Sequence, residues 1–226
     1  MPHKRCKEVW FFDELSDQAK EKARDWYRAG NLDYDWYDSI YESAEQAGKY
    51  LGIDLNQKPV KLMNGKTRLD PSIWFTGFYH QGSGSAYDAT WRASDVKGES
   101  LKADFATDTE LHRLADEFNL LALANPEMTA RVKSERERDT SINVEVEQGE
   151  TADERINELE YKSPEWHAQN AIDGELSEAL EEALNDFNHW IYKSLEREYE
   201  WLNADEQVDD SIRANNYEFT EDGNIA

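Results

Sequence analysis

The spacing of apolar residues changes along this chain, and this change constrains the fold more than any other feature. Up to Gly52 the apolar positions recur every three or four residues, which is typical of helices. From Ile53 to about residue 148 most segments alternate apolar and polar residues or gather aromatic ones, as β-strands do. Helical spacing returns after about residue 173. The pattern predicts an α+β fold in which an antiparallel sheet packs against helices.

Residues 1–52 are predicted to form a helical hairpin of two antiparallel helices. The first helix runs from the N-cap candidate Ser16 to Gly30, and the second covers about residues 35–52. Each contains a stripe of apolar residues at helical spacing, so we expect the two helices to pack together.

Residues 53–148 are predicted to form a sheet of about four or five strands with one helix, at about residues 107–125. The dipeptide Asn64-Gly65 predicts a hairpin turn, because it readily adopts positive φ angles. Aromatic-rich strands are predicted at residues 72–80 and 86–94, joined by the loop QGSGS. Two half-buried strands are predicted at residues 128–138 and 141–148, with Asp139-Thr140 as their turn.

Residues 149–226 are predicted to contain an irregular or partly helical connection, a long helix and a short final helix. Apolar residues between Leu176 and Leu202 mark about seven turns at ~3.6 residues per turn. We expect residues 1–226 to form a single domain, since 226 residues lie near the upper size that one hydrophobic core organises.

The net charge of −24 limits the partners that the chain can bind. Contact with a nucleic acid backbone or an anionic membrane would add like-charge repulsion, so we expect neither. A basic protein is a better partner for such a surface, which could also imitate nucleic acid. Solubility, or adaptation to a salty cytoplasm, is an alternative explanation of the acidity.

The chain lacks the patterns that signal export, metal binding or catalysis. No segment approaches the ~20 apolar residues of a membrane span, and no apolar run of signal-peptide length opens the sequence, so a cytoplasmic location is expected. The single cysteine and the scattered histidines predict no metal and no cofactor. No serine elbow or cysteine–histidine signature suggests catalytic residues, which favours a binding protein over an enzyme.

Residues 73–92 contain the densest candidate for a ligand site. Backbone N–H groups of a glycine-rich loop can hold phosphate or carboxylate, and neighbouring aromatic rings can stack on a base. Alternatively, the glycines only form the turn and the aromatic side chains fill the core. The candidate ligand-binding residues are Trp74, Tyr79, His80, Gln81, Gly82, Ser83, Gly84, Ser85, Tyr87, Trp91 and Arg92.

Carboxylates are concentrated after Gly174 and suggest a surface for a basic partner. Placed along helices and interleaved with aromatic residues, they could imitate a duplex backbone; a solvated helix face without a partner is the alternative. The candidate partner-binding residues are Glu181, Glu182, Glu196, Glu200, Asp205, Glu206, Asp209 and Asp210.

Two stretches carry a resemblance to a known family: GFYHQGSGS at residues 77–85 and WIYKSLEREYEWLNADEQVDDSIRANNYEFTEDG at residues 190–223. They resemble an uncharacterised family of acidic tailed-phage and prophage proteins, whose members are sometimes labelled the antitoxin of a toxin–antitoxin system. The resemblance extends over most of the chain. The loop departs from the family's usual GFWSQGDGA at Tyr79, His80, Ser83 and Ser85, and so lacks its carboxylate. The resemblance implies an accessory phage protein that binds and neutralises a host component.

We therefore expect a non-catalytic, phage-type binding protein that inhibits or sequesters a component of a host defence or toxin system. In one mechanism the acidic helices engage a basic host protein, as a nucleic-acid mimic or an antitoxin would. In the other, the aromatic strands and the QGSGS loop trap a nucleotide immune signal. A nucleotide-processing enzyme is a further alternative, and homo-oligomer formation is left open.

Overall fold

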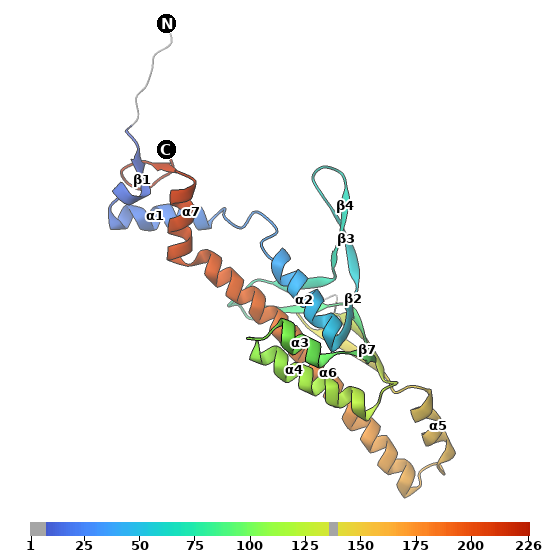
Figure 1. Ribbon diagram of the computed structural model, residues 1–226. Helices are drawn as coiled ribbons and strands as arrows, with labels where there is room; N and C mark the ends of the chain where they lie inside the picture. The colour runs from blue at the N-terminus through green and yellow to red at the C-terminus, as the bar shows by residue number, and fades with distance from the viewer. Residues whose placement is uncertain (1–7, 136–139) are drawn as a thin grey trace. The chain divides into compact units, whose positions relative to one another are not determined.

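The computed structural model describes residues 8–135 and 140–226. Their contacts form two compact units (Figure 1). One, the terminal unit, combines the described parts of residues 1–38 and 195–226; the other, the central unit, comprises residues 39–194. This grouping does not test whether residues 1–226 form a single domain, which stays a prediction.

The central unit is built on an antiparallel sheet of four strands in the order β2-β7-β8-β9. Two further antiparallel ladders, β3-β4 and β5-β6, belong to the same unit. The strands are β2 (Gly52–Leu55), β3 (Gln57–Lys61), β4 (Thr67–Pro71), β5 (Ile73–Thr76), β6 (Gly84–Tyr87), β7 (Ala89–Val96), β8 (Thr129–Ser134) and β9 (Ile142–Glu147). The predicted α+β class with an antiparallel sheet is confirmed.

Helices complete the central unit, and they are α2 (Asp38–Leu51), α3 (Gly98–Asp104), α4 (Thr109–Ala124), α5 (Glu150–Glu158) and the long α6 (Pro164–Asn203), which continues into the terminal unit. Alternation along β7 places Ala89, Trp91 and Ala93 in the core. Phe187 of α6 is buried as well; its ring meets Tyr87 edge-on at 5.7 Å and stacks on Trp190 at 5.8 Å between centroids. The β5-β6 ladder and α6 therefore share an aromatic core.

Helix α6 begins earlier than the sequence pattern predicts. The connection up to about residue 173, predicted to be irregular or partly helical, contains α5 and the first turns of α6. Ser163 caps α6, since its Oγ accepts a hydrogen bond from the Trp166 N–H at 3.0 Å, and Pro164 occupies the first helical position, where proline is favoured. Most residues of these first turns are exposed or half-buried, so no apolar stripe marks them.

The terminal unit joins the two ends of the described chain. Its elements are β1 (Trp10–Phe11), the 3-10 helix η1 (Phe12–Glu14), α1 (Asp17–Arg28), α7 (Asp205–Ala214) and β10 (Glu218–Phe219). β1 pairs with β10 in an antiparallel ladder. The core of this unit consists of Phe12, Leu15, Ala19, Ala23, Val208, Ile212 and Phe219.

Helix α1 packs against α7, whereas the sequence predicts a hairpin with the following helix. That helix, α2, has nearly all of its residues in the central unit. The small residues Ala19 and Ala23 on α1 lie in one core with Val208 and Ile212 of α7. Helical spacing thus predicts the helix correctly but not its partner, because any complementary apolar stripe could cover these alanines.

The turn at Asn64-Gly65 is confirmed by the β3-β4 register and by the φ of 79° at Gly65. Residue 139, and with it the predicted turn at Asp139-Thr140, lies outside the described residues, as do residues 136–138 of the predicted strand 128–138. No helix in the described part of the chain is long and apolar enough to span a bilayer.

Candidate functional site

The predicted QGSGS loop borders a groove on α6 with a volume of about 350 Å³, which we call the loop–α6 groove. All of its lining residues belong to the central unit. They are Ser83, Gly84, Ser85, Thr140, Asn185, Asn188, His189, Tyr192 and Lys193. Hydroxyl, amide, imidazole and ammonium groups therefore meet at one surface, and such a set can hydrogen-bond an anionic or polar ligand.

Buried hydrogen bonds fix β6 against α6 at the floor of this groove. The Ser85 Oγ lies 3.0 Å from the Asn188 carbonyl oxygen and 2.9 Å from its Oδ1, and the Asn188 Nδ2 donates to the Ser85 carbonyl at 2.7 Å. Two residues further along β6, the Tyr87 hydroxyl donates to the Leu184 carbonyl at 3.0 Å. The predicted site residues Ser85 and Tyr87 thus hold the strand on the helix.

Two of the predicted stacking residues are core residues. Tyr87 and Trp91 are fully buried, and burial raises the pKa of the Tyr87 phenol above its ordinary value. The Trp91 Nε1 donates to the Leu51 carbonyl at 2.9 Å, and its ring lies 6.0 Å from that of Phe118. Neither ring offers a free face to a ligand. Both side chains fill the core, which was the alternative interpretation of these aromatic residues.

The remaining loop candidates do not line the groove. Tyr79 is largely exposed with a positive φ of 65°, and His80, Gln81 and Gly82 are exposed beside it. Half-buried Trp74 lies under the Lys58 ammonium, 4.5 Å from the ring centroid, and exposed Arg92 lies 3.8 Å from the Asp95 carboxylate. Of the candidates, the structure brings Ser83, Gly84 and Ser85 to the groove.

Gly84 lies beside a turn, but its role is to allow close packing against Thr140 and not to form the turn. It begins β6 without a positive φ, whereas Gly82 in the loop has a φ of 90°. A Cβ on Gly84 would lie 3.0 Å from the Thr140 Cβ and 3.1 Å from its carbonyl oxygen. Glycine is thus required there for close approach to Thr140, and Gly82 for the turn.

The sequence interpretation missed the helical wall of the groove. Asn185, His189 and Tyr192 follow one another at spacings of four and three residues, so they share a face of α6. Along α6 these polar and aromatic residues alternate with the buried residues Leu184 and Phe187. This alternation in the sequence could have identified the face of α6 that lines the groove.

Replacing Asn188 with alanine is expected to lower the free energy of unfolding by about 1–3 kcal/mol, because the buried Ser85 carbonyl loses the Asn188 Nδ2 donor and the Ser85 hydroxyl loses one of its two acceptors. Asn185→Ala is the matched control: the exposed Asn185 amide donates to the Glu181 carbonyl of its own helix and to no other described residue, so we expect a change of about 0.5 kcal/mol or less. Urea unfolding measures both. Equal losses would show that the Ser85–Asn188 contact contributes little.

The predicted acidic residues are divided between the two units. Glu181 and Glu182 belong to the central unit, and the others lie in the terminal unit. There, Asp205 forms an ion pair with Arg28, Asp209 lies 2.6 Å from the Arg24 guanidinium, and Asp210 lies 3.1 Å from that of Arg213. Glu196 and Glu200 also have interaction partners, whereas Glu206 is exposed.

Three exposed carboxylates follow one another on the central part of α6: Glu175, Glu178 and Glu181. They are spaced three residues apart, and none takes part in an ion pair with another described residue. We call them the carboxylate stripe. Because no cation in the described part of the chain pairs with these carboxylates, they are available to a basic partner.

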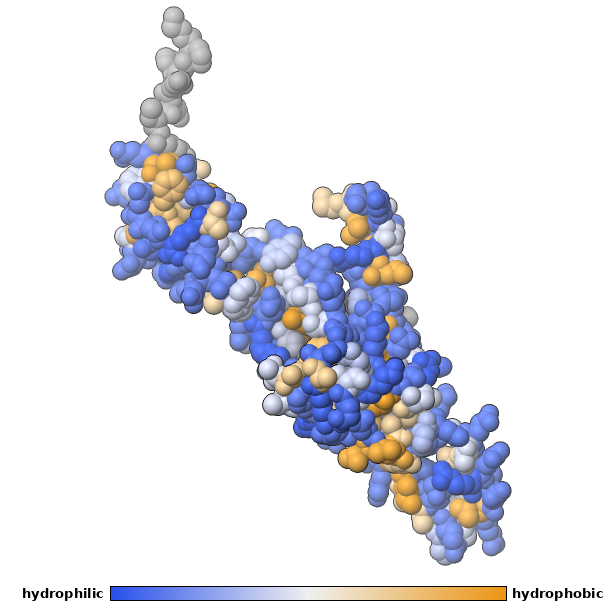
Figure 2. Space-filling view, viewed as in Figure 1, coloured by the Kyte–Doolittle hydropathy of each residue, from blue (hydrophilic) through white to orange (hydrophobic). Residues whose placement is uncertain are grey.

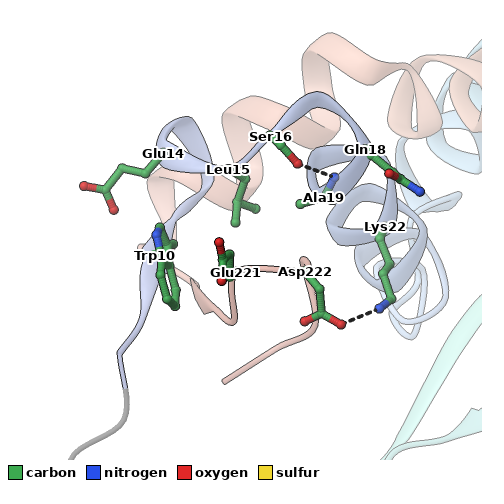
Figure 3. A pocket seen from close by; sticks show the side chains of 9 residues that line it. All are labelled: Trp10, Glu14, Leu15, Ser16, Gln18, Ala19, Lys22, Glu221 and Asp222. Atoms are coloured by element: carbon green, nitrogen blue, oxygen red, sulfur yellow. Dashed lines mark hydrogen bonds and ion pairs between the residues drawn. The ribbon is translucent and has the colours of Figure 1, made fainter.

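The terminal unit contains a cleft of about 540 Å³ between its first and last elements (Figure 3). Trp10 and Glu221 lie at one end, and the Lys22 ammonium pairs with Asp222 at 3.1 Å at the other. Hydrogen bonds from the Thr220 hydroxyl and from Lys22 lower the pKa of Asp222. The Glu14 carboxylate accepts the Phe11 N–H at 2.8 Å, so most charged groups here already serve the local fold.

Within residues 8–135 and 140–226, no three histidine, cysteine, aspartate or glutamate side chains are grouped as metal ligands are. Whether the protein binds a metal or a cofactor is not tested by this finding, and their expected absence stays a prediction.

Residues 36–205 match the family described as Domain of unknown function (DUF8835). The chain belongs to the DUF8835 family. The DUF8835 region holds the entire central unit, including the loop–α6 groove and the carboxylate stripe, whereas α1, β1 and β10 lie outside it. No curated protein and no solved structure matches the chain significantly. The predicted membership of an uncharacterised family agrees with this match, while phage origin and the antitoxin label stay predictions.

Proposed function

We propose that this DUF8835 protein is a non-catalytic binding protein whose carboxylate stripe engages a basic protein. Its target would be a component of a host defence or toxin system, which it inhibits or sequesters. The observation that carries the proposal is the stripe of Glu175, Glu178 and Glu181, which is exposed on α6 and forms no ion pair with another described residue, in a chain of net charge −24. The host context rests on the resemblance to phage proteins.

Helix geometry supports an imitation of nucleic acid. At a rise of ~1.5 Å per residue, carboxylates three residues apart advance about 4.5 Å along α6. Phosphates advance about 3.4 Å per nucleotide along one DNA strand, so the two linear charge densities are of the same order. A basic groove that binds phosphates could therefore accept this helix, as could the basic surface of a toxin.

Reversing the stripe with Glu175→Lys, Glu178→Lys and Glu181→Lys is expected to abolish capture of the partner. We expect at least about a tenfold loss of affinity at 0.1 M salt, because three attractive contacts become repulsive ones. The measurement is affinity capture from host lysate with wild type and variant as bait, followed by binding of the recovered protein to each.

The matched control reverses three exposed carboxylates on another helix of the same unit, with Asp153→Lys, Glu154→Lys and Glu158→Lys on α5. Both triple variants have the same net charge. If both lose the partner equally, overall charge governs binding and the stripe has no specific role.

A second candidate function is trapping of a nucleotide signal in the loop–α6 groove. The Lys193 ammonium, the exposed His189 and the Ser83 hydroxyl line this groove and suit phosphate oxygens, and Tyr192 supplies a ring beside them. A nucleotide-processing enzyme is a further candidate at the same groove, and it would differ from a trap by releasing an altered nucleotide.

A melting screen against mononucleotides and cyclic nucleotides tests this second candidate. A binder present at 100 times its dissociation constant should stabilise the protein by about 2.7 kcal/mol, and Lys193→Ala should remove most of that gain. An unchanged gain in Lys193→Ala would place the ligand elsewhere, and chromatography of the recovered nucleotide separates trapping from turnover.

A further inference from the structure

The β3-β4 hairpin projects from the central unit as an arm (Figure 1). Its strands pair with each other through five residue pairs and belong to a separate two-stranded sheet. A two-stranded hairpin alone is marginally stable in water, and usually needs a further strand or a packed helix. An arm of this kind gains stability if another surface covers it.

The tip of the arm is basic and apolar, although the chain as a whole has a net charge of −24. Lys61 and Lys66 are exposed on either side of the turn and have no ion pair with another described residue. Met63 between them is fully exposed. Figure 2 shows apolar atoms on this arm among hydrophilic surface. We call Lys61, Met63 and Lys66 the hairpin tip.

A groove of about 320 Å³ between α4 and α6 has the complementary character. Its apolar lining is made of Leu120, Leu121, Ala179 and Ala183. Leu120 is 67% exposed, and Leu123 one turn further along α4 is 78% exposed. Such large apolar side chains exposed side by side on a helix are typical of a surface that a partner covers.

The rim of the α4–α6 groove is acidic. Its charged residues are Glu117, Glu182, Asp186 and one cation, Arg113. The Arg113 guanidinium pairs with the Glu117 carboxylate and lies 2.7 Å from the Asp186 carboxylate. Its formal charge is thus −2, and Glu182 has no ion pair with another described residue. The two lysines of the hairpin tip carry positive charges that are complementary to this negative rim. The apolar side chain of Met63 is complementary to the apolar lining of the groove.

The arm projects away from α4 in Figure 1, so a hairpin tip does not contact the groove of its own chain. We propose that the hairpin tip docks into the α4–α6 groove of a second copy of this chain. Each copy offers one tip and one groove, so two copies related by a two-fold axis form a closed dimer with two identical contacts. This interface uses none of the stripe residues and is independent of the proposed function.

Two charge-reversed variants of the full chain test the dimer. One carries Lys61→Glu and Lys66→Glu, and the other carries Glu117→Lys and Glu182→Lys. Each variant alone places like charges in both contacts and should be monomeric by sedimentation at 0.1 M salt, where wild type is dimeric. An equimolar mixture restores opposite charges in both contacts, so a heterodimer should form. Met63→Ser should weaken the wild-type dimer at least about tenfold.

Melting curves check that the variants are folded, which is expected because all of the substituted side chains lie on the surface or at the rim. A monomeric wild type, variants that still dimerise, or a mixture that stays monomeric would each overturn the proposal. The proposal would also be overturned if wild type were monomeric and bound a DNA oligonucleotide through Lys61 and Lys66. The stripe variant Glu175→Lys, Glu178→Lys and Glu181→Lys should remain dimeric, which separates this interface from the binding of a basic partner.

Discussion

Trp91→Ala is expected to lower the free energy of unfolding by about 3–5 kcal/mol, the largest effect of any single substitution considered. Trp91 is 0% exposed on β7, its ring contacts Phe118, and its indole N–H donates to the Leu51 carbonyl. Alanine would leave a cavity and a buried carbonyl without its donor. Urea unfolding followed by circular dichroism measures the loss.

Trp201→Ala provides a control of the same residue type. Trp201 is 52% exposed near the end of α6, and alanine favours helix, so we expect a loss of about 1 kcal/mol or less. The loss in free energy of unfolding for Trp91→Phe should lie between those for Trp91→Ala and Trp201→Ala, because phenylalanine keeps most of the apolar surface but loses the hydrogen bond. If Trp91→Ala were as stable as wild type, Trp91 would not be the core residue that its burial indicates.

Breaking the ion pair between Arg24 and Asp209 is expected to destabilise the terminal unit by about 2–3 kcal/mol. Two hydrogen bonds of 2.6 and 2.9 Å join the guanidinium to the two carboxylate oxygens, and the side chains are only 15% and 14% exposed. Exposed pairs contribute about 0–1 kcal/mol, whereas removing one partner of a buried pair costs about 3–5 kcal/mol, so this pair falls between. A double-mutant cycle with Arg24→Met and Asp209→Asn measures the coupling.

The same pair gives the terminal unit a pH dependence. The hydrogen bonds from Arg24 hold the pKa of Asp209 below its ordinary value, while Asp209 raises that of Arg24. A carboxyl whose pKa is lower in the folded state stabilises the fold above its unfolded pKa of about 3.9, and this stabilisation is lost as the pH falls through the folded pKa. The stability difference between wild type and Asp209→Asn should therefore shrink below about pH 4. A difference that stays constant down to pH 2 would contradict this assignment.

The role of Asp209 in this pair also changes how the acidic surface must be tested. The sequence places Asp209 among the partner-binding candidates, because every carboxylate after Gly174 contributes to the same excess of charge. Reversal of Asp209 would break the ion pair with Arg24 and destabilise the terminal unit, so a loss of binding could not be attributed to a lost contact. The stripe residues form no ion pair with another described residue, so their reversal should change binding more than stability.

Local patterns predicted the elements of this fold well. Aromatic and β-branched residues predicted a strand at residues 86–94, where most of β7 lies, and Asn64-Gly65 predicted the turn between β3 and β4. These features depend on neighbouring residues, so the sequence contains the information they need. Helix α6 was predicted only from Leu176, because its earlier turns bury too little apolar surface to leave a stripe.

Contacts between distant segments were not predictable in the same way. An aromatic strand next to a glycine-rich loop suits both a stacking surface and a core, and the Leu51 carbonyl that binds Trp91 gives no local signal in residues 73–92. Likewise, the alanines of α1 do not specify α7 as their partner. The helical wall of the loop–α6 groove required knowing which face of α6 turns toward Ser83.

The salt dependence of partner binding tests the proposed function most directly. The affinity of the protein recovered from host lysate should be measured for wild type and for Glu175→Gln, Glu178→Gln and Glu181→Gln between 0.1 and 1 M salt, over which the Debye length falls from ~10 Å to ~3 Å. We predict a steep loss of wild-type affinity, a weaker and flatter response of the variant, and convergence of the two at high salt. Equal affinities with equal salt dependence would contradict a carboxylate stripe that binds a basic protein.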